Sequence, residues 1–174
     1  LLAGAGGAQV IEFKKRETLE SIIARRVEFL TGYQDAAYAD QYRDFVAQVQ
    51  QAESRLGGKT TLSEAVARYL FKLMAYKDEY EVARLHRDPA FQADLAERFG
   101  ADAAYRVMLL PPVLKAVGLK RKVGLSRPAA RVAFGTLAAM KRLRHTRLDP
   151  FGRDHVRVVE RQLVVDYEAV LDEI

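Results

Sequence analysis

Residues 66–85 read Val66-Ala-Arg-Tyr-Leu-Phe-Lys-Leu-Met-Ala-Tyr-Lys-Asp-Glu-Tyr-Glu-Val-Ala-Arg-Leu85, and this stretch decides the fold class. Its apolar side chains recur every three or four residues, which is the spacing of one face of an α-helix. Upstream, Thr61 and Glu64 have the spacing of a capping box, in which each side chain satisfies a free backbone N–H group. We therefore expect one amphipathic helix that starts at Thr61 and continues to Leu85.

The same periodicity predicts helices on both sides of this stretch. Thr18 suits the N-cap of a first helix, Gly57-Gly58 suits the end of a second, and Asp88-Pro89 suits the start of a short fourth one. For the last helix we expect an inner face made of Val156, Val159, Leu163, Tyr167 and Val170. The helices are expected to span, approximately, residues 19–30, 35–56, 61–85, 88–100, 128–145 and 149–174.

One segment between these helices has a different character. Residues 105–112 end in Pro111-Pro112, and proline disfavours the helical region for the residue before it, so an extended run is expected. Gly118 to Gly124 can supply a return strand. The sequence thus predicts a mainly α protein: an irregular bundle of about six helices with a small extended or β-hairpin lobe around residues 104–124.

The composition limits the classes of protein to which the chain can belong. With 174 residues, 49% of them hydrophobic, the chain is large enough for one domain with a buried core. It contains no cysteine, which excludes disulfides, thiolate metal sites and Cys-ligated iron–sulfur clusters within it. No apolar run approaches the roughly 20 residues of a membrane-spanning helix, and we find no secretory leader. We expect a cytoplasmic protein without a membrane partner.

The first residues, Leu1-Leu-Ala-Gly-Ala-Gly-Gly7, lack an initiator methionine and are rich in glycine and alanine. This composition is typical of a flexible connection between folded parts. We therefore expect residues 1–12 to be a flexible linker to upstream sequence. Residues 13–174 are expected to form a single helical domain.

The net charge of +5 is unevenly distributed along the chain. No aspartate or glutamate lies between Asp102 and Asp149, whereas this interval holds eleven lysines and arginines. We expect a basic patch that serves as an interdomain or solvated surface, as a docking site for an acidic protein or phosphorylated cofactor, or as a nucleic-acid site. The lack of a recognisable binding motif argues against nucleic acid. The candidate patch residues are Lys120, Arg121, Lys122, Arg127, Arg131, Lys141, Arg142 and Arg144.

We find no set of residues suited to catalysis or to metal binding. The three histidines, His86, His145 and His155, lack the spacing of a helical ligand pair, either with each other or with a carboxylate. The acidic cluster near residue 80 could supply paired acids, but Lys77 and Glu81 are spaced for an ion pair, and nothing indicates a raised carboxylate pKa. We therefore expect an interdomain helix face there, made of Lys77, Asp78, Glu79, Tyr80, Glu81 and Arg84.

Four blocks of sequence carry a resemblance to a known family. They are Ile23 to Tyr38, Tyr69 to Leu85, Leu109 to Leu114, and Asp149-Pro-Phe-Gly-Arg153 followed by Asp166-Tyr-Glu168. In this order, and from about Phe13 onward, the chain resembles the C-terminal region of the fused, thiamine-diphosphate-dependent indolepyruvate ferredoxin oxidoreductases. None of the four blocks is a mechanistic motif.

The resemblance implies a supporting role in an enzyme whose chemistry lies elsewhere. Enzymes of that family oxidatively decarboxylate aryl-2-oxoacids to acyl-CoA and pass the electrons to ferredoxin. Their cofactors are thiamine diphosphate, magnesium and iron–sulfur clusters, and coenzyme A is a co-substrate. For this segment the resemblance implies that residues 13–174 are a C-terminal accessory domain, with no catalytic residue and no cofactor of its own. Its implied partners are the upstream catalytic domains, acidic ferredoxin and further copies in a homo-oligomeric enzyme. The alternative is an independent helical adaptor or a module that binds nucleic acid or another polyanion.

Overall fold

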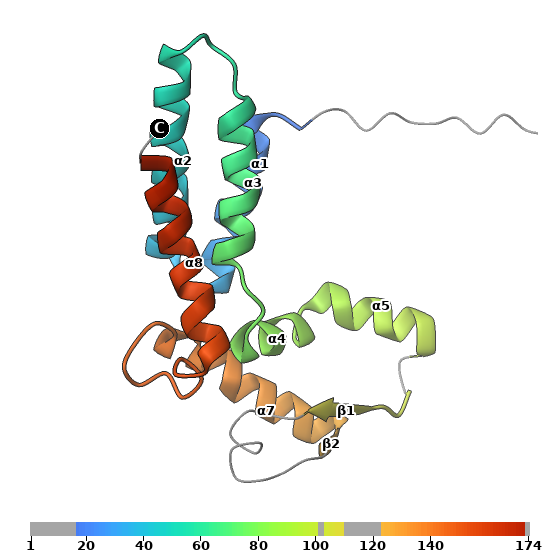
Figure 1. Cartoon of the computed structure of the whole chain (residues 1–174). Helices are drawn as coiled ribbons and strands as arrows, with labels where there is room; N and C mark the ends of the chain where they lie inside the picture. Colours follow the sequence, from blue (N-terminus) through green and yellow to red (C-terminus); the bar gives the residue numbers. More distant parts are fainter. Residues whose placement is uncertain (1–16, 101–102, 110–122, 173–174) are drawn as a thin grey trace, which may run out of the picture.

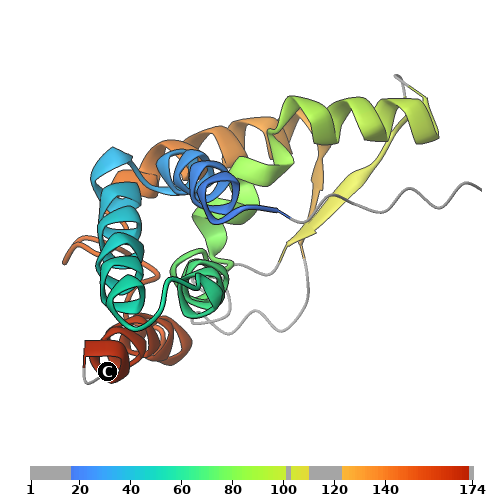
Figure 2. The ribbon, with the colours of Figure 1, turned by 90° about the horizontal axis from the view of Figure 1, so that it is seen from above.

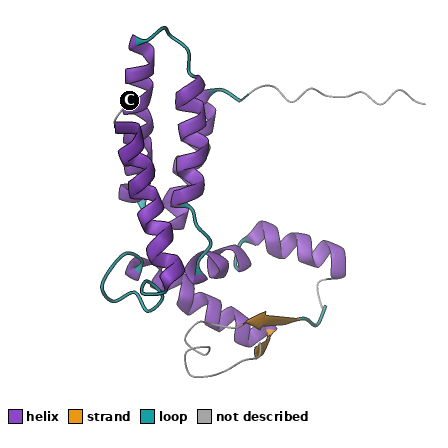
Figure 3. Cartoon of the chain, in the orientation of Figure 1, coloured by secondary structure: helices purple, strands orange, loops and turns teal. Residues whose placement is uncertain are grey.

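The computed structural model describes residues 17–100, 103–109 and 123–172 of the chain. In these ranges the protein is mainly α-helical, with one pair of short strands (Figure 3). The elements form an upright group of helices and a smaller lobe at its base (Figure 1). The predicted mainly α class and the small β-hairpin lobe are confirmed. The expected linker, residues 1–12, lies outside the described ranges.

The upright group consists of α1 (Leu19–Tyr33), α2 (Ala36–Arg55), α3 (Thr61–Met74) and α8 (His155–Asp172). Figure 2 shows these four helices almost end-on, with α8 beside α2 and α3. The first three helices share the main hydrophobic core, whose central members include Ile22, Leu30, Val46, Val66 and Leu70. Burial of these apolar side chains contributes most of the free energy that holds the three helices together.

The starts of α1 and α2 and the end of α2 lie within one residue of the predicted positions, whereas α1 continues to Tyr33, beyond its predicted end at residue 30. Thr18 is the N-cap of α1, and its Oγ1 accepts a hydrogen bond from the Ser21 N–H at 3.3 Å. Asp35 caps α2 in the same way, with its Oδ1 2.9 Å from the Tyr38 nitrogen. After α2, Gly58 has a φ of +71°, a conformation that glycine adopts without the strain of a side chain.

The start of α3 differs from the predicted capping box. Thr60, and not Thr61, is the N-cap residue, and its side chain makes no capping hydrogen bond. Instead, Glu53 of α2 accepts hydrogen bonds from the backbone N–H groups of Leu62 (2.8 Å) and Ser63 (2.9 Å). The free N–H groups of α3 are therefore satisfied from a neighbouring helix, which also fixes α2 against α3.

The helix predicted over residues 61–85 is in fact two helices. After α3 ends at Met74, residues 75–78 connect it to α4 (Glu79–His86). Asp78 is the N-cap of α4, and its Oδ1 accepts from the Glu81 N–H at 2.8 Å. The prediction of one helix was wrong because an aspartate that binds backbone N–H groups favours a helix start over a helix interior. This division explains why the described residues contain seven α-helices where six were expected.

The lobe consists of α4, α5 (Pro89–Phe99), the strands β1 (Arg106–Leu109) and β2 (Val123–Ser126), and α7 (Arg127–Ala139). The strands are antiparallel, with Arg106 opposite Ser126. The predicted return strand at residues 118–124 overlaps β2 only at its end, and residues 110–122 lie outside the described ranges. A second, smaller core joins Ala83 of α4 to Ala130 and Phe134 of α7.

The C-terminal part departs from the prediction at two points. The helix expected to reach His145 ends at Ala139 and continues as a 3₁₀ turn over Met140–Leu143, and the last helix begins at His155 rather than at residue 149. Its predicted inner face was also wrong, except for Tyr167. The side chains of α8 that pack on the main core are Val164, Tyr167 and Leu171. Between 41% and 62% of the surface is exposed at the other predicted members, which are Val156, Val159, Leu163 and Val170.

In the part of the chain that the structure describes, we find no helix with the length and apolar character required to cross a membrane.

Candidate functional site

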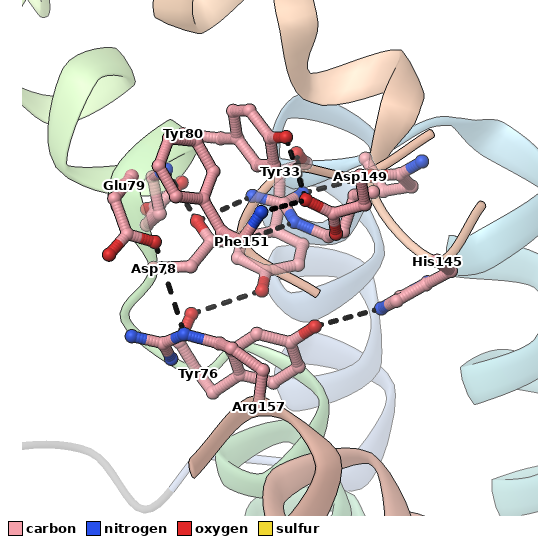
Figure 4. A network of polar contacts seen from close by, with 12 residues as sticks. Tyr33, Tyr76, Asp78, Glu79, Tyr80, His145, Asp149, Phe151 and Arg157 are labelled. Atoms are coloured by element: carbon pink, nitrogen blue, oxygen red, sulfur yellow. Dashed lines mark hydrogen bonds and ion pairs between the residues drawn. The ribbon is translucent and has the colours of Figure 1, made fainter. Parts of the chain in front are cut away.

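Polar side chains from four parts of the chain meet at the base of the upright group (Figure 4). They come from the end of α1, from residues 75–78, from α4, and from the segment that joins the 3₁₀ turn to α8. We call this set the junction cluster, and its members are Tyr33, Tyr76, Asp78, Tyr80, Arg144, His145 and Asp149.

Arg144 is the central residue of the junction cluster. Its Nε lies 2.6 Å from Oδ2 of Asp78, and its Nη2 lies 2.8 Å from Oδ1 of the same carboxylate. Its Nη1 donates to the backbone oxygen of Tyr33 at 2.7 Å, and the guanidinium lies over the ring of that tyrosine, 3.8 Å from its centre. Arg144 and Asp78 are only 2% and 3% exposed. A buried charge is costly unless it is paired and hydrogen-bonded, and here both conditions are met.

Tyr80 and Asp149 form a second polar pair in the cluster. The Tyr80 hydroxyl donates to Oδ1 of Asp149 at 2.9 Å, and the Phe151 N–H donates to the same oxygen at 3.0 Å. The rings of Tyr80 and Phe151 pack edge to face. Burial, together with the hydrogen bond to Asp149, raises the pKa of Tyr80, so its hydroxyl stays protonated at neutral pH.

Tyr76 and His145 form the third pair. The Tyr76 hydroxyl and Nε2 of His145 are 2.9 Å apart, and the Tyr33 hydroxyl donates to the backbone oxygen of Tyr76 at 3.0 Å. Burial raises the pKa of Tyr76 to about 12. Desolvation and then the positive charge of Arg144 lower the pKa of His145. At neutral pH the pair is therefore a neutral imidazole beside a protonated phenol.

These contacts indicate a structural role for the junction cluster. Its tyrosines are protonated, its two carboxylates accept hydrogen bonds from within the chain, and its histidine is bonded to Tyr76. A general base or nucleophile needs an available lone pair, and a general acid an available proton, within reach of a substrate. No group of histidine and carboxylate side chains that could hold a metal ion is found among the described residues. We conclude that the cluster connects α1, α4 and the C-terminal segment.

The structure corrects the predicted interdomain helix face. Asp78, Tyr80 and Glu81 are between 1% and 3% exposed within this chain alone, so they cannot be presented to a neighbouring domain. Both oxygens of Glu81 bind Arg84, at 2.7 Å each, and not Lys77 as the spacing suggested. The members left at or near the surface are Lys77, which is exposed, and Glu79 and Arg84, which are half-buried.

The predicted basic patch is not one continuous surface in the described residues. Arg144 is buried against Asp78, and Lys141 is half-buried, with its Nζ donating to the backbone oxygen of Gly32 at 2.7 Å. Arg142 is exposed after α7, whereas Arg127 and Arg131 are exposed on its first two turns. A helix of 13 residues is about 20 Å long, so these two groups are well separated. The other three candidates, Lys120, Arg121 and Lys122, lie outside the described residues.

The sequence analysis missed a cleft between α5 and the β-hairpin. It contains a cavity of about 560 Å³, lined mainly by apolar side chains of α5 and β1. No residue of α5 is buried. The signal was present in the sequence, because Phe91, Leu95 and Phe99 recur every four residues on one side of the helix. Periodicity of this kind shows that a face is apolar but does not show what covers it.

Comparison with known proteins supplies a family for the chain but no function. Neither a search of curated proteins nor a search of solved structures finds a match. Residues 19–174, nearly the whole chain, match one family model. The protein therefore belongs to DUF6537, a family of unknown function.

Proposed function

We propose that this chain is a structural and docking domain of a thiamine-diphosphate-dependent 2-oxoacid ferredoxin oxidoreductase, a cytoplasmic enzyme, and that it has no catalytic centre of its own. Two lines of argument support the proposal. The first is the resemblance of four sequence blocks, in order, to the C-terminal region of indolepyruvate ferredoxin oxidoreductases. The second is that the buried side chains Asp78, Glu81, Arg144 and Asp149 all bind groups within the chain, while large apolar side chains are left at the surface.

The exposed face of α8 is the observation that carries the proposal. Val156, Val159, Leu163 and Val170 are separated by three, four and seven residues, which places them in one stripe along the helix. We call these four residues the α8 stripe. Tyr167, which packs on the main core together with Val164 and Leu171, borders this stripe. The apolar surface of α8 is therefore wider than the part that the described chain covers, and the uncovered part indicates a further packing partner.

The proposed occupant of the α8 stripe is a catalytic domain of the same oxidoreductase. The stripe is made only of aliphatic side chains, whereas an acidic protein such as ferredoxin requires basic residues on the surface that it meets. For ferredoxin, or for the phosphates of coenzyme A, the better candidates are the exposed arginines Arg142 and Arg147. Thiamine diphosphate, magnesium and iron–sulfur clusters would belong to the catalytic domains.

The direct test is purification of the native protein that contains this sequence. We expect an intact mass far above that of a 174-residue chain, bound thiamine diphosphate and iron, and 2-oxoacid-dependent reduction of ferredoxin. A native protein of about the size of this chain, without thiamine and iron, would contradict the proposal and would favour the independent adaptor. Salt-sensitive binding to nucleic acid would favour a polyanion-binding module.

Substitution in the α8 stripe then tests the docking role. In the native enzyme we expect Val159→Glu with Leu163→Glu to lower ferredoxin reduction or to separate the subunits, because charges would be introduced into an apolar contact. Val132→Glu on α7 is the matched control, since Val132 is 72% exposed. Equal activity and assembly in the two variants would count against the α8 stripe as the docking face.

A further inference from the structure

The cleft between α5 and the β-hairpin consists of two adjoining cavities of different character. The larger one has a volume of about 560 Å³ and the smaller one about 360 Å³. Figure 1 shows α5 and the hairpin as two arms that extend from α4 and α7. Both cavities are lined by the same five residues, which therefore form the boundary between them: His86, Gln92, Tyr105, Val107 and Arg127.

The larger cavity is apolar. Leu95, Ala96 and Phe99 of α5 line one side of it, and Val107 and Met108 of β1 line the other. Phe99 is 69% exposed and Met108 is 54% exposed, so neither side chain is covered by the described part of the chain. The volume lies within the range of small-molecule sites, which is roughly 300–1,000 Å³. An aromatic ring or a short acyl chain fits a cavity of this size and lining.

The smaller cavity is basic. Arg87, Arg127 and Arg131 line it, and among the described residues no aspartate or glutamate lines either cavity. Within residues 17–100, 103–109 and 123–172, neither Arg87 nor Arg131 takes part in an ion pair. Guanidinium groups bind carboxylate and phosphate oxygens through paired N–H donors. An anionic group is therefore the chemistry that this cavity fits.

The boundary between the two cavities is held in place by packing. The His86 ring stacks on Phe134 with 4.7 Å between ring centres and meets Phe91 edge to face. Nε2 of Gln92 donates to the backbone oxygen of His86 at 2.6 Å. Because the boundary is built from α4, α5 and α7 together, the apolar and basic cavities have a fixed relative position.

We propose that this cleft binds a small amphipathic anion. The apolar cavity takes an aryl or short acyl group, and the three arginines take the carboxylate or phosphate attached to it. The site is separate from the α8 stripe and does not depend on the docking role proposed above.

The test is calorimetric titration of the 174-residue chain with three probes that share one ring system. The probes are naphthalene-2-carboxylate, 2-naphthyl phosphate and the uncharged naphthalene-2-carboxamide. We expect at least one anion to bind about tenfold more tightly than the amide, because a hydrogen bond to a charged group contributes more than one to a neutral group. The tighter of the two anions identifies the acid group that the site prefers.

Three variants locate the binding. Arg127→Gln with Arg131→Gln should weaken binding of the anions by about tenfold and leave the amide unchanged. Ala96→Trp should weaken binding of all three probes, because it fills the apolar cavity. Arg55→Gln is the matched control, since Arg55 is exposed at the far end of α2. If Ala96→Trp fails to fold, as judged by circular dichroism, the single substitution Arg131→Gln still tests the site, because Arg131 is exposed and its replacement should not disturb the fold.

Three results would overturn the proposal. The first is equal affinity for the amide and for both anions, which would show that the basic cavity does not take part in recognition. The second is no binding of any probe at millimolar concentration, and the third is binding that is unchanged in both the arginine variant and the tryptophan variant. None of these results bears on the cofactor content of the native protein, so the docking proposal is tested separately.

Discussion

Arg144 and Asp78 lie 66 residues apart in the sequence and form a buried ion pair with two hydrogen bonds. It is one of several long-range contacts at the junction, together with the Tyr80–Asp149 and Tyr76–His145 hydrogen bonds, and it is the one of these that joins two buried charges. The pair also determines a local feature, because Asp78 begins α4 as its N-cap. The carboxylate of Asp78 thus contributes both to a helix cap and to a long-range ion pair.

We expect Arg144→Met to lower the free energy of unfolding by about 3–5 kcal/mol, since it leaves the buried carboxylate of Asp78 without its partner. Urea denaturation followed by circular dichroism measures this change. Arg142→Met is the control, because Arg142 is exposed. A loss of less than about 1 kcal/mol for Arg144→Met would show that the pair behaves like a surface ion pair.

The histidines should give the fold a dependence on pH. Desolvation lowers the pKa of His86 and of His145 in the folded chain, and the charges of Lys77 and Arg144, respectively, act in the same direction. The unfolded chain then takes up protons first, so stability is fully present above about pH 6.5 and is lost as the pH falls below it. We expect the urea midpoint to decrease between about pH 7.5 and about pH 5.5. The variant His86→Asn with His145→Asn should show a smaller decrease, and an unchanged decrease would contradict this account.

At the scale of helices and strands, the sequence predicts best those features that depend on near neighbours. Thr18 and Asp35 each cap a helix through an N–H group three residues away, so their roles follow from the local sequence. The cap of α4 by Asp78 is equally local, so the break at residues 75–78 had a signal in the sequence that the apolar periodicity obscured. The cap of α3 depends on Glu53, which is nine residues from Leu62, and periodicity within one helix does not contain that contact.

The cap of α3 by Glu53 can be measured directly. Although partial desolvation raises the pKa of Glu53, hydrogen bonds from Ser63 and Leu62 outweigh this effect and leave its pKa below the usual value. We expect Glu53→Ala to destabilise the fold by about 1–2 kcal/mol. Glu64→Ala should cost less, since the predicted capping box is not formed. An equal or larger loss of stability for Glu64→Ala, measured by urea denaturation, would indicate that the capping box of Thr61 and Glu64 is the main cap of α3.

The apolar faces show the second limit of sequence reasoning. The three–four spacing correctly identified an apolar stripe on α8, but its members Val156, Val159 and Leu163 are exposed, while Val164 and Leu171 are packed on the core. The candidate surface residues show the same limit, because Arg144 and Asp78 are buried. A pattern of residue types gives the faces of a helix, and only the tertiary structure gives the partner of each face.

At the scale of the whole molecule, the described residues combine a three-helix core with uncovered apolar regions that include the α8 stripe and the cleft beside α5. The polar side chains of the junction cluster are occupied by contacts within the chain. The large uncovered side chains are therefore the features through which the molecule can meet other molecules.

The α8 stripe should cause the isolated 174-residue chain to self-associate at high concentration, because aliphatic side chains at heptad spacing are covered when two helices pair. Sedimentation velocity over a range of concentrations should show an average mass that increases with concentration. Val159→Glu with Leu163→Glu should keep the chain monomeric, whereas Val132→Glu should not. A wild-type chain that stays monomeric throughout would argue against this property of the stripe.

The guanidinium of Arg144 reaches back to the backbone of Tyr33, 111 positions earlier in the chain. During synthesis on the ribosome, α1, α2 and α3 emerge long before this arginine does, and they have most of their apolar core available to collapse. Until Arg144 has been synthesised, Asp78 lacks its ion-pair partner. The nascent chain therefore passes through a stage in which the contacts at the base of the bundle are not yet formed.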